Sequence, residues 1–552
     1  MLLIFLLFLI IAISLPYFSL SSINSGVFWK RISVISLVII SLLYLETITL
    51  DFNNTITLYN GLFAHTLQNS IFIGIIIFSG LILNTITGDL SINNSTNTLN
   101  VINNKIDLSL DTRNRERLVF VFSLIIGGII LSGSSDMLTV LLGLELQSYS
   151  AYILAASYRN YEPSEAAGLK YFLLGALSSA LIFMGLGLLY VYTGNTMIDL
   201  SFLILSSINY SNSIFTIDTM VPYLGGILIL IGFFWKIAAA PLQAWSIDVY
   251  DAVPTKTTAI LSIIPKIGLI SFIVKITYDL TSLVNFAVLL EKGFNLNVLD
   301  INYIIYVIIA LSLIVGSIYG IFQPRIKRLL AYSSVLNIGF ILMGTLLINY
   351  GQHDNFNPLF YLIQYIITTS TIWLCLTSIE KLSYIEVTLI SQLQGIANEN
   401  QYGRFNTLSI LNFKTTFIAI SLTVLILSTA GIPPMVGFFA KYEVILLSLK
   451  TEYFTLAILA ILASLISTYY YLNIVKNIWF KTALVNLSVQ PTNLVLSGAT
   501  RSADQPFESY QKDKLSEITG ISSQISLLTI SIALFAIQYS VIYTFLTLSG
   551  HF

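Results

Sequence analysis

The sequence predicts an all-α polytopic membrane protein with about 14 transmembrane helices, arranged as two inverted five-helix repeats with broken helices 7 and 12. Three observations support this fold class. The 552-residue chain has a mean hydropathy of +0.85, and 10% of its residues are charged, whereas soluble proteins carry about 25%. Apolar stretches of about 20 residues, the length of a membrane-spanning helix, recur along the whole chain. Prolines interrupt corresponding stretches of two halves.

Each predicted span is an apolar stretch between polar or charged segments. The stretches are 2–20, 32–50, 66–88, 117–133, 136–157, 166–193, 222–245, 253–278, 302–321, 327–349, 358–379, 411–449, 452–479 and 523–547. No charged segment separates Met1 from the first stretch, so we expect a retained span rather than a signal peptide. The twelfth stretch is too long for one straight helix, and Pro433 and Pro434 within it predict a break.

This pattern divides the chain into four regions. The third and fourth spans are joined by the polar segment 89–116, and the last two by the polar segment 481–521, both interpreted as surface insertions. Because each repeat crosses the membrane an odd number of times, the second repeat is expected to be inverted. The regions are 1–116 (three spans and a polar loop), 117–278 (first repeat), 302–480 (second repeat), and 481–552 (polar loop and last span).

Lysine and arginine predict the orientation of the chain. They gather in the loops after odd-numbered spans, whereas the opposite side has mainly Lys292 and Lys450. Positively charged loops stay inside, so both termini are expected to face outside.

Composition also excludes several classes of function. The net charge of −1 lacks the excess of positive charge that is typical of a nucleic-acid-binding protein. The single cysteine, Cys375, excludes a disulfide framework and a four-cysteine cluster. The histidines His65, His353 and His551 lie near span ends or loops, where they do not favour a haem inside the bilayer. We therefore expect no redox cofactor and no nucleotide on this chain.

Two neighbouring spans each combine a lysine with a proline. Lys236 is followed by Pro241 in the seventh span, and Pro265 directly precedes Lys266 in the eighth. A lysine at the bilayer centre costs roughly 2.5–3.5 kcal/mol on insertion scales. Proline removes a backbone hydrogen bond, and the freed carbonyl needs a partner or water, so helix breaks are expected at Pro241 and Pro265. The two pairs predict a polar path inside the membrane.

Two more ionisable residues lie in mid-span, Glu145 in the fifth and Lys441 in the twelfth. Burial favours the neutral form of a carboxyl and of an amine, whereas a nearby opposite charge favours both ionised forms. Glu145 and Lys236 are therefore a candidate ion pair whose separation changes the proton affinity of each. A proton relay needs this chemistry and requires no metal or nucleophile.

A structural interpretation competes with this one. Buried charges also serve as static pairs that hold helices together, but four such groups, three of them near prolines, favour a function. Lys170, at the start of the sixth span, is a candidate point of proton uptake. Asp248 and Asp251 are interpreted as solvated turn residues.

Five segments of this sequence resemble the antiporter-like subunits of respiratory complex I. They are LGLELQSYSAYIL, SEAAGLKYFLLGA, FFWKIAAAPLQAWSIDVYDAVPTKTTAILSIIPKIG, IKRLLAYSSVLNIGF and LSTAGIPPMVGFFAKY. The resemblance extends from about residue 117 to residue 480. The five segments taken together are highly specific for this family. It implies two inverted five-helix bundles with broken helices at their interface.

The resemblance also implies roles for single residues. Glu145 matches the glutamate of span 5 in the family and Lys236 the lysine of span 7. Lys266 matches the central lysine and Lys441 the distal lysine of span 12. Asn337 departs from the pattern, because many relatives have histidine there; asparagine does not titrate, so water would have to take over any relay at this position.

Such a subunit would carry protons from the matrix to the intermembrane space. NADH, FMN, iron–sulfur clusters and ubiquinone would lie on other subunits. Its partners would be other membrane subunits of complex I, notably chains 4 and 4L, and lipids such as cardiolipin, with no nucleic acid. It would be a multi-pass protein of the mitochondrial inner membrane with both termini toward the intermembrane space.

The resemblance leads to a mechanism that can be tested. Protons would enter through water near Lys170, load Lys236 and Lys266, and leave through Lys441. Two alternatives remain at this point: a cation/proton antiporter subunit, and a purely structural membrane subunit.

Overall fold

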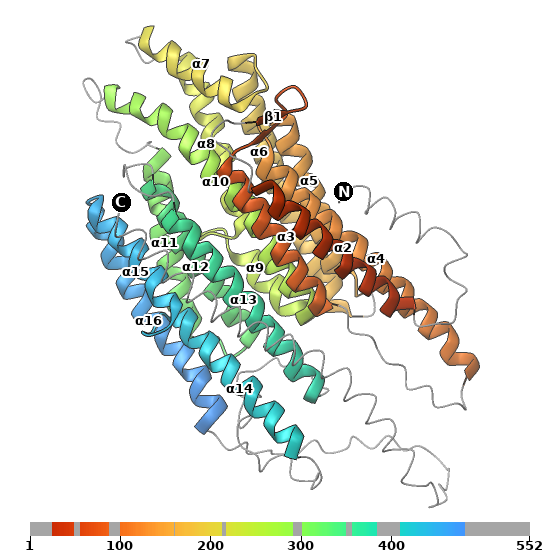
Figure 1. The fold of residues 1–552 in the computed structure, drawn as a ribbon. Coiled ribbons are helices and arrows are strands. Elements are labelled where there is room, and N and C mark those ends of the chain that lie inside the picture. Colours follow the sequence, from red (N-terminus) through yellow and green to blue (C-terminus); the bar gives the residue numbers. More distant parts are fainter. Residues whose placement is uncertain are drawn as a thin grey trace, which may run out of the picture.

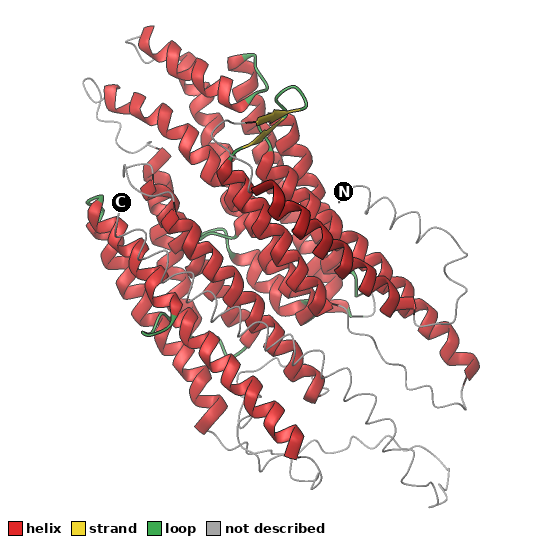
Figure 2. Ribbon diagram, viewed as in Figure 1, coloured by secondary structure: helices red, strands yellow, loops and turns green. Residues whose placement is uncertain are grey.

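The computed structural model describes residues 25–48, 56–87, 100–158, 161–211, 217–290, 301–348, 356–383 and 409–480. Within these ranges the chain is helical apart from its turns and one small hairpin (Figure 2). The strands β1 (Ile56–Leu58) and β2 (Phe63–His65) pair antiparallel in that hairpin.

The helices follow the hydropathy of the chain. Their bounds are α2 (Ser25–Ile48), α3 (Leu67–Thr87), α4 (Asn100–Gly133), α5 (Met137–Ala156), α6 (Glu162–Thr193), α7 (Ile198–Ser211), α8 (Ile217–Ile237), α9 (Ala244–Ala252), α10 (Thr255–Leu290), α11 (Ile301–Ile321), α12 (Ile326–Ile348), α13 (Phe356–Ser383), α14 (Ser409–Ala430), α15 (Val436–Lys450) and α16 (Phe454–Phe480).

The membrane-spanning character of the chain is confirmed. Eight helices of the described part are long and apolar enough to cross a bilayer, and four shorter apolar helices accompany them. These twelve coincide with the predicted spans from the second to the thirteenth. The predicted spans 2–20 and 523–547 lie outside the described residues.

The structure differs from the prediction in two connections. The helix α4 begins at Asn100, so the second part of the segment 89–116, expected to be a surface loop, is helical. This segment is polar but lacks glycine and proline from residue 100 onward, and polarity alone does not prevent a helix. The predicted region boundary at residue 116 therefore falls inside α4. The second difference is α7, which has 14 residues and is too short to cross a bilayer about 30 Å thick.

Two groups of helices show the same packing (Figure 1). In the first group α4 packs on α5 and α10, and in the second α11 packs on α12 and α16. Close contacts of glycine support the correspondence. A Cβ atom on Gly127 would meet the backbone of Gln147, and one on Gly316 would meet the backbone of Leu336. Each glycine precedes its contact by the same number of residues, so the two groups are repeats of one unit.

The most enclosed helices lie between the repeats. In α10, 94% of the membrane-spanning window is buried, and in α12 the value is 89%, whereas it is 33% in α6 and in α16. α10 packs on α12 and α13, and α9 also packs on α12. The interface between the repeats is therefore the core of the protein, and the broken helices lie beside it.

Candidate functional site: buried charges at two broken helices

The first break separates α8 from α9. α8 ends at Ile237 and α9 begins at Ala244, with Pro241 in the non-helical segment between them. Helical hydrogen bonding stops here, and the indole nitrogen of Trp245 donates to the carbonyl oxygen of Trp235 at 2.8 Å. The Trp235 carbonyl oxygen also accepts from the backbone N–H of Ala238 at 3.1 Å, so the indole is its second donor and ties the start of α9 to the end of α8.

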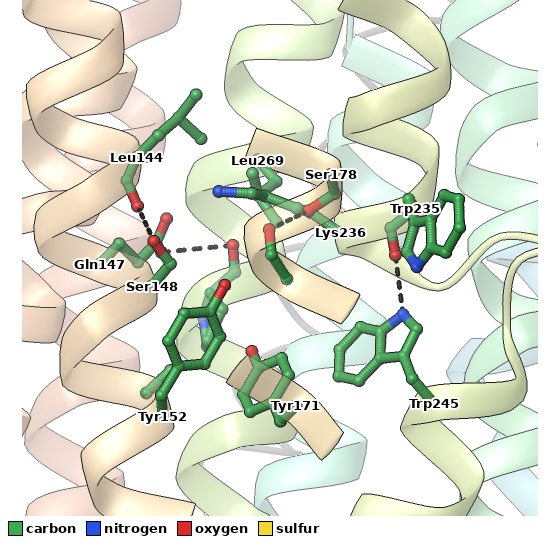
Figure 3. Close-up of a pocket in the computed structure, with 13 residues that line it drawn as sticks. Leu144, Gln147, Ser148, Tyr152, Tyr171, Ser178, Trp235, Lys236, Trp245 and Leu269 are labelled. Carbon is green, nitrogen blue, oxygen red and sulfur yellow. Dashed lines mark hydrogen bonds between the residues drawn. The ribbon is translucent and has the colours of Figure 1, made fainter. Parts of the chain in front are cut away.

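Lys236 lies at this break and lines a small cavity (Figure 3). Its Nζ atom is buried and has no hydrogen-bond partner in the described part of the chain. The cavity wall includes the polar side chains of Gln147, Ser148 and Ser178. The cavity has a volume of about 20 Å³. Roughly 10–15 Å³ is enough to hold one water. The amine of Lys236 is thus next to a space in which a proton can be passed to water.

Glu145 is on α5 and is half-buried. It interacts electrostatically with Lys236 and with Tyr149 on its own helix. The Lys236 ammonium makes no hydrogen bond to it, so the structure shows the two groups near each other without the expected close pair.

Pro265 lies inside α10, which continues through it from Thr255 to Leu290. The break expected at Pro265 is absent. Instead Gln147 of α5, which is 3% exposed, donates through Nε2 to the carbonyl oxygens of Ile264 and Pro265 at 3.4 and 3.3 Å. A side chain of a neighbouring helix thus contacts the proline-containing turn, which links α5 to α10 at this depth.

Lys266 follows on α10 and is 3% exposed. Its Nζ atom donates to the hydroxyl of Ser334 on α12 at 2.9 Å. It also lies 5.5 Å from the centre of the Tyr250 ring of α9, a distance at which a ring face attracts a cation. Lys266 therefore joins the first repeat to the second.

The second break separates α14 from α15 and contains Pro433 and Pro434. Gly431 has φ +80°, a left-handed conformation that glycine adopts without strain. Lys441 of α15 is 5% exposed and donates to the carbonyl oxygens of Thr429 and Ala430 at 2.9 and 3.0 Å. At this break the freed carbonyls are thus bound by the lysine itself.

Asn337 lies on α12 of the second repeat. It is 4% exposed, and its Oδ1 atom accepts a hydrogen bond of 3.0 Å from the Tyr361 hydroxyl of α13. This side chain orders a hydroxyl, although it cannot carry a proton itself.

Charged residues at one end of the bundle are paired in a way that the sequence did not show. Lys170 of α6, at which we expected proton uptake, is about half exposed and forms a salt bridge with Asp248 of α9. Asp251 of the same helix is bound by Arg325, directly before α12, and by Arg328 of α12. Both aspartates lie on a helix and not in a turn. The interpretation as a solvated residue was wrong for Asp251, which is 11% exposed, whereas Asp248 is about half exposed.

The described residues thus include three lysines with buried amines at or beside the two breaks, one half-buried glutamate, and hydroxyl groups from both repeats. An amine is able to take up or release a proton, and a hydroxyl is able both to donate and to accept a hydrogen bond. No group of three or more His, Cys, Asp or Glu side chains that could hold a metal ion occurs among the described residues.

Comparisons with known proteins agree with this arrangement. Residues 134–467 match the family model described as NADH:quinone oxidoreductase/Mrp antiporter, transmembrane. NADH-ubiquinone oxidoreductase chain 2 of Rhizopus oryzae is 34% identical over 471 residues, which cover 82% of each chain. The chain 2 of Metridium senile is 35% identical over 364 residues, covering 66% of this chain and 83% of that protein.

Solved structures share the fold. A chain of respiratory complex I from Thermus thermophilus, determined with bound aureothin, has a TM-score of 0.64 at 21% identity and covers 98% of each chain. A chain of the Mrp complex from Dietzia has a TM-score of 0.65 at 16% identity, over 86% of this chain and 78% of that one.

Proposed function

The chain belongs to the NADH:quinone oxidoreductase/Mrp antiporter transmembrane family, and from this premise we infer that it is a proton-translocating subunit in the membrane arm of respiratory complex I. It is a multi-pass inner-membrane protein and part of an enzyme complex that couples electron transfer from NADH to ubiquinone with proton movement. Other subunits of complex I are its partners. The observation that carries the proton path is the row of buried amines of Lys236, Lys266 and Lys441 at or beside the two broken helices.

In the proposed path, protons leave the matrix near the Lys170–Asp248 pair and reach the cavity of Lys236. They pass from there to Lys266 and leave toward the intermembrane space through Lys441. The contact between Lys266 and Ser334 supports a transfer into the second repeat. Glu145 sets the proton affinity of Lys236 through its distance, and a neighbouring subunit changes that distance. The energy passed on is a coupling free energy between the two sites.

The finer assignments belong to the same proposal. NADH, FMN, iron–sulfur clusters and ubiquinone are bound by other subunits. Chains 4 and 4L are the neighbours in the membrane, and cardiolipin is among the bound lipids. Both termini face the intermembrane space, in agreement with the distribution of lysine and arginine.

The test is the substitution Lys266→Ala in the complete complex, with Lys476→Ala as the control. Lys476 is an exposed lysine on α16, so its loss leaves the path intact. Assembly is checked on a native gel, and NADH-driven quinone reduction and proton pumping are measured together. We expect an intact complex in which both rates fall for Lys266→Ala alone.

Two results would contradict the proposal. An intact Lys266→Ala complex with wild-type rates would make Lys266 a structural lysine. Exchange of sodium or potassium by the reconstituted complex without electron transfer would instead support the cation/proton antiporter alternative. The substitution Lys236→Ala separates the structural alternative further. A proton-transfer role of Lys236 predicts an assembled complex with reduced pumping. A static ion pair predicts either that the complex fails to assemble or that it assembles and pumps normally.

A further inference from the structure

The short helix α9 touches both lysine sites of the first repeat. Near its beginning, Trp245 donates to the carbonyl of Trp235, the residue before Lys236. The indole also stacks on the Tyr171 ring of α6, with ring centres 4.7 Å apart and planes 8° apart. The N-terminal end of α9 is therefore fixed to the cavity of Lys236.

The other part of the same helix reaches Lys266. Tyr250 is 1% exposed, and its ring centre is 5.5 Å from the Nζ atom of Lys266. A helix of nine residues moves as one body on this scale, so a displacement of α9 changes the surroundings of both lysines together.

The C-terminal end of α9 is held by the second repeat. The Asp251 carboxylate, 11% exposed, accepts hydrogen bonds from Arg325 at 2.5 Å and from Arg328 at 2.9 Å. Lys327, which is 3% exposed, donates to the carbonyl oxygen of Val253 at 3.0 Å, directly after the helix. These three basic residues all lie at the start of α12.

The two arginines make Asp251 the strongest of the charged contacts of α9. Hydrogen bonds between ionised groups are about twice as strong as neutral ones, and the largely buried Asp251 carboxylate receives two of them from half-exposed arginines. The salt bridge between Asp248 and Lys170 has both partners 45% exposed, and such surface pairs contribute only about 0–1 kcal/mol. The C-terminal end of α9 is therefore held mainly by the second repeat, whereas its N-terminal end is held by the first.

We propose that Asp251, bound by Arg325 and Arg328, is a positioning residue that holds α9 against Lys236 and Lys266 and thereby permits proton transfer between them. The inference rests on the proposed function and adds Asp251 and its two arginines to it. These three residues couple the repeats, because any movement of the start of α12 is transmitted through Asp251 to both lysine sites.

The experiment compares Asp251→Asn with the exchange variant Asp251→Arg/Arg328→Asp in the complete complex. Asp199→Asn is the matched control, because it removes an exposed carboxylate from an ion pair with Lys275 at the other end of α10. Assembly, NADH-driven quinone reduction and the number of protons pumped per NADH are measured. We expect Asp251→Asn to lower coupled turnover by roughly three- to tenfold, because small displacements of reacting groups have effects of this size or larger.

The exchange variant separates a positioning role from a merely structural one. It restores one ion pair with reversed charges, so we expect it to recover a large part of the pumping. Equal pumping by Asp251→Asn and wild type, or no recovery in an assembled exchange variant, overturns the inference. If Asp251→Asn does not assemble, Arg328→Gln, which keeps Arg325 as a partner, is measured instead, and wild-type pumping then overturns it.

The failure of the proposed function gives a different result. If Lys266→Ala pumps as wild type does, the proton path itself is wrong. If Lys266→Ala loses pumping while Asp251→Asn keeps it, the path stands and only the positioning role of Asp251 is refuted.

Discussion

The substitution Gly437→Ala tests the close approach of the two halves of the second broken helix. Gly437 lies in the first turn of α15, and a Cβ atom there would overlap the carbonyl oxygen of Ser428 on α14. The two halves would have to separate by about 1 Å or more to reach an ordinary contact. Overpacking of this kind costs about 1–3 kcal/mol.

The same displacement reaches the lysine of the site. Lys441 donates to the carbonyls of Thr429 and Ala430 at 2.9 and 3.0 Å, and a shift of about 1 Å brings both distances beyond the range of a hydrogen bond. Hydrogen bonds to a charged group contribute about 1.5–3 kcal/mol each. We therefore expect the substitution to lower both the thermal stability of the complex and its proton pumping.

The assay is the midpoint of thermal disassembly on native gels, together with NADH-driven pumping. Gly187→Ala is the control, because this glycine lies on the exposed face of α6 and a Cβ atom there meets nothing within 4 Å. The same midpoint and pumping in the Gly437→Ala and Gly187→Ala complexes would refute the packing argument.

Three further substitutions test single contacts of the site. Trp245→Phe keeps an aromatic ring but removes the indole donor to the Trp235 carbonyl, which keeps the backbone N–H of Ala238; we expect a loss of about 0.5–1.5 kcal/mol, seen as a lower disassembly midpoint, and an unchanged midpoint would speak against this role. Tyr361→Phe leaves the oxygen of Asn337 without its donor, with a similar expected loss of about 1–3 kcal/mol in the same assay. Lys441→Gln keeps a donor near the freed carbonyls but no charge, so we expect normal assembly and no pumping through this site, and retained pumping would exclude Lys441 from the path.

The sequence by itself determined the class of the protein and the position of most helices. Hydropathy depends only on the residues within each stretch, so the spans could be placed without knowing their neighbours. The breaks at Pro241 and at Pro433–Pro434 were also local, because proline removes a helical hydrogen bond wherever it stands. For the same reason Lys236, Lys266 and Lys441 could be chosen as buried charges from their depth in apolar stretches.

Only the tertiary structure decided how these elements meet. Pro265 does not break α10, and Gln147 of another helix binds carbonyls of the turn that contains it. Glu145 and Lys236 are near each other but not hydrogen-bonded. Asp251 looked like a solvated turn residue until the start of α12 was placed beside it. In each case the partner lies far away in the sequence, and the energy of a contact depends on distance and burial, which a single stretch of residues does not contain.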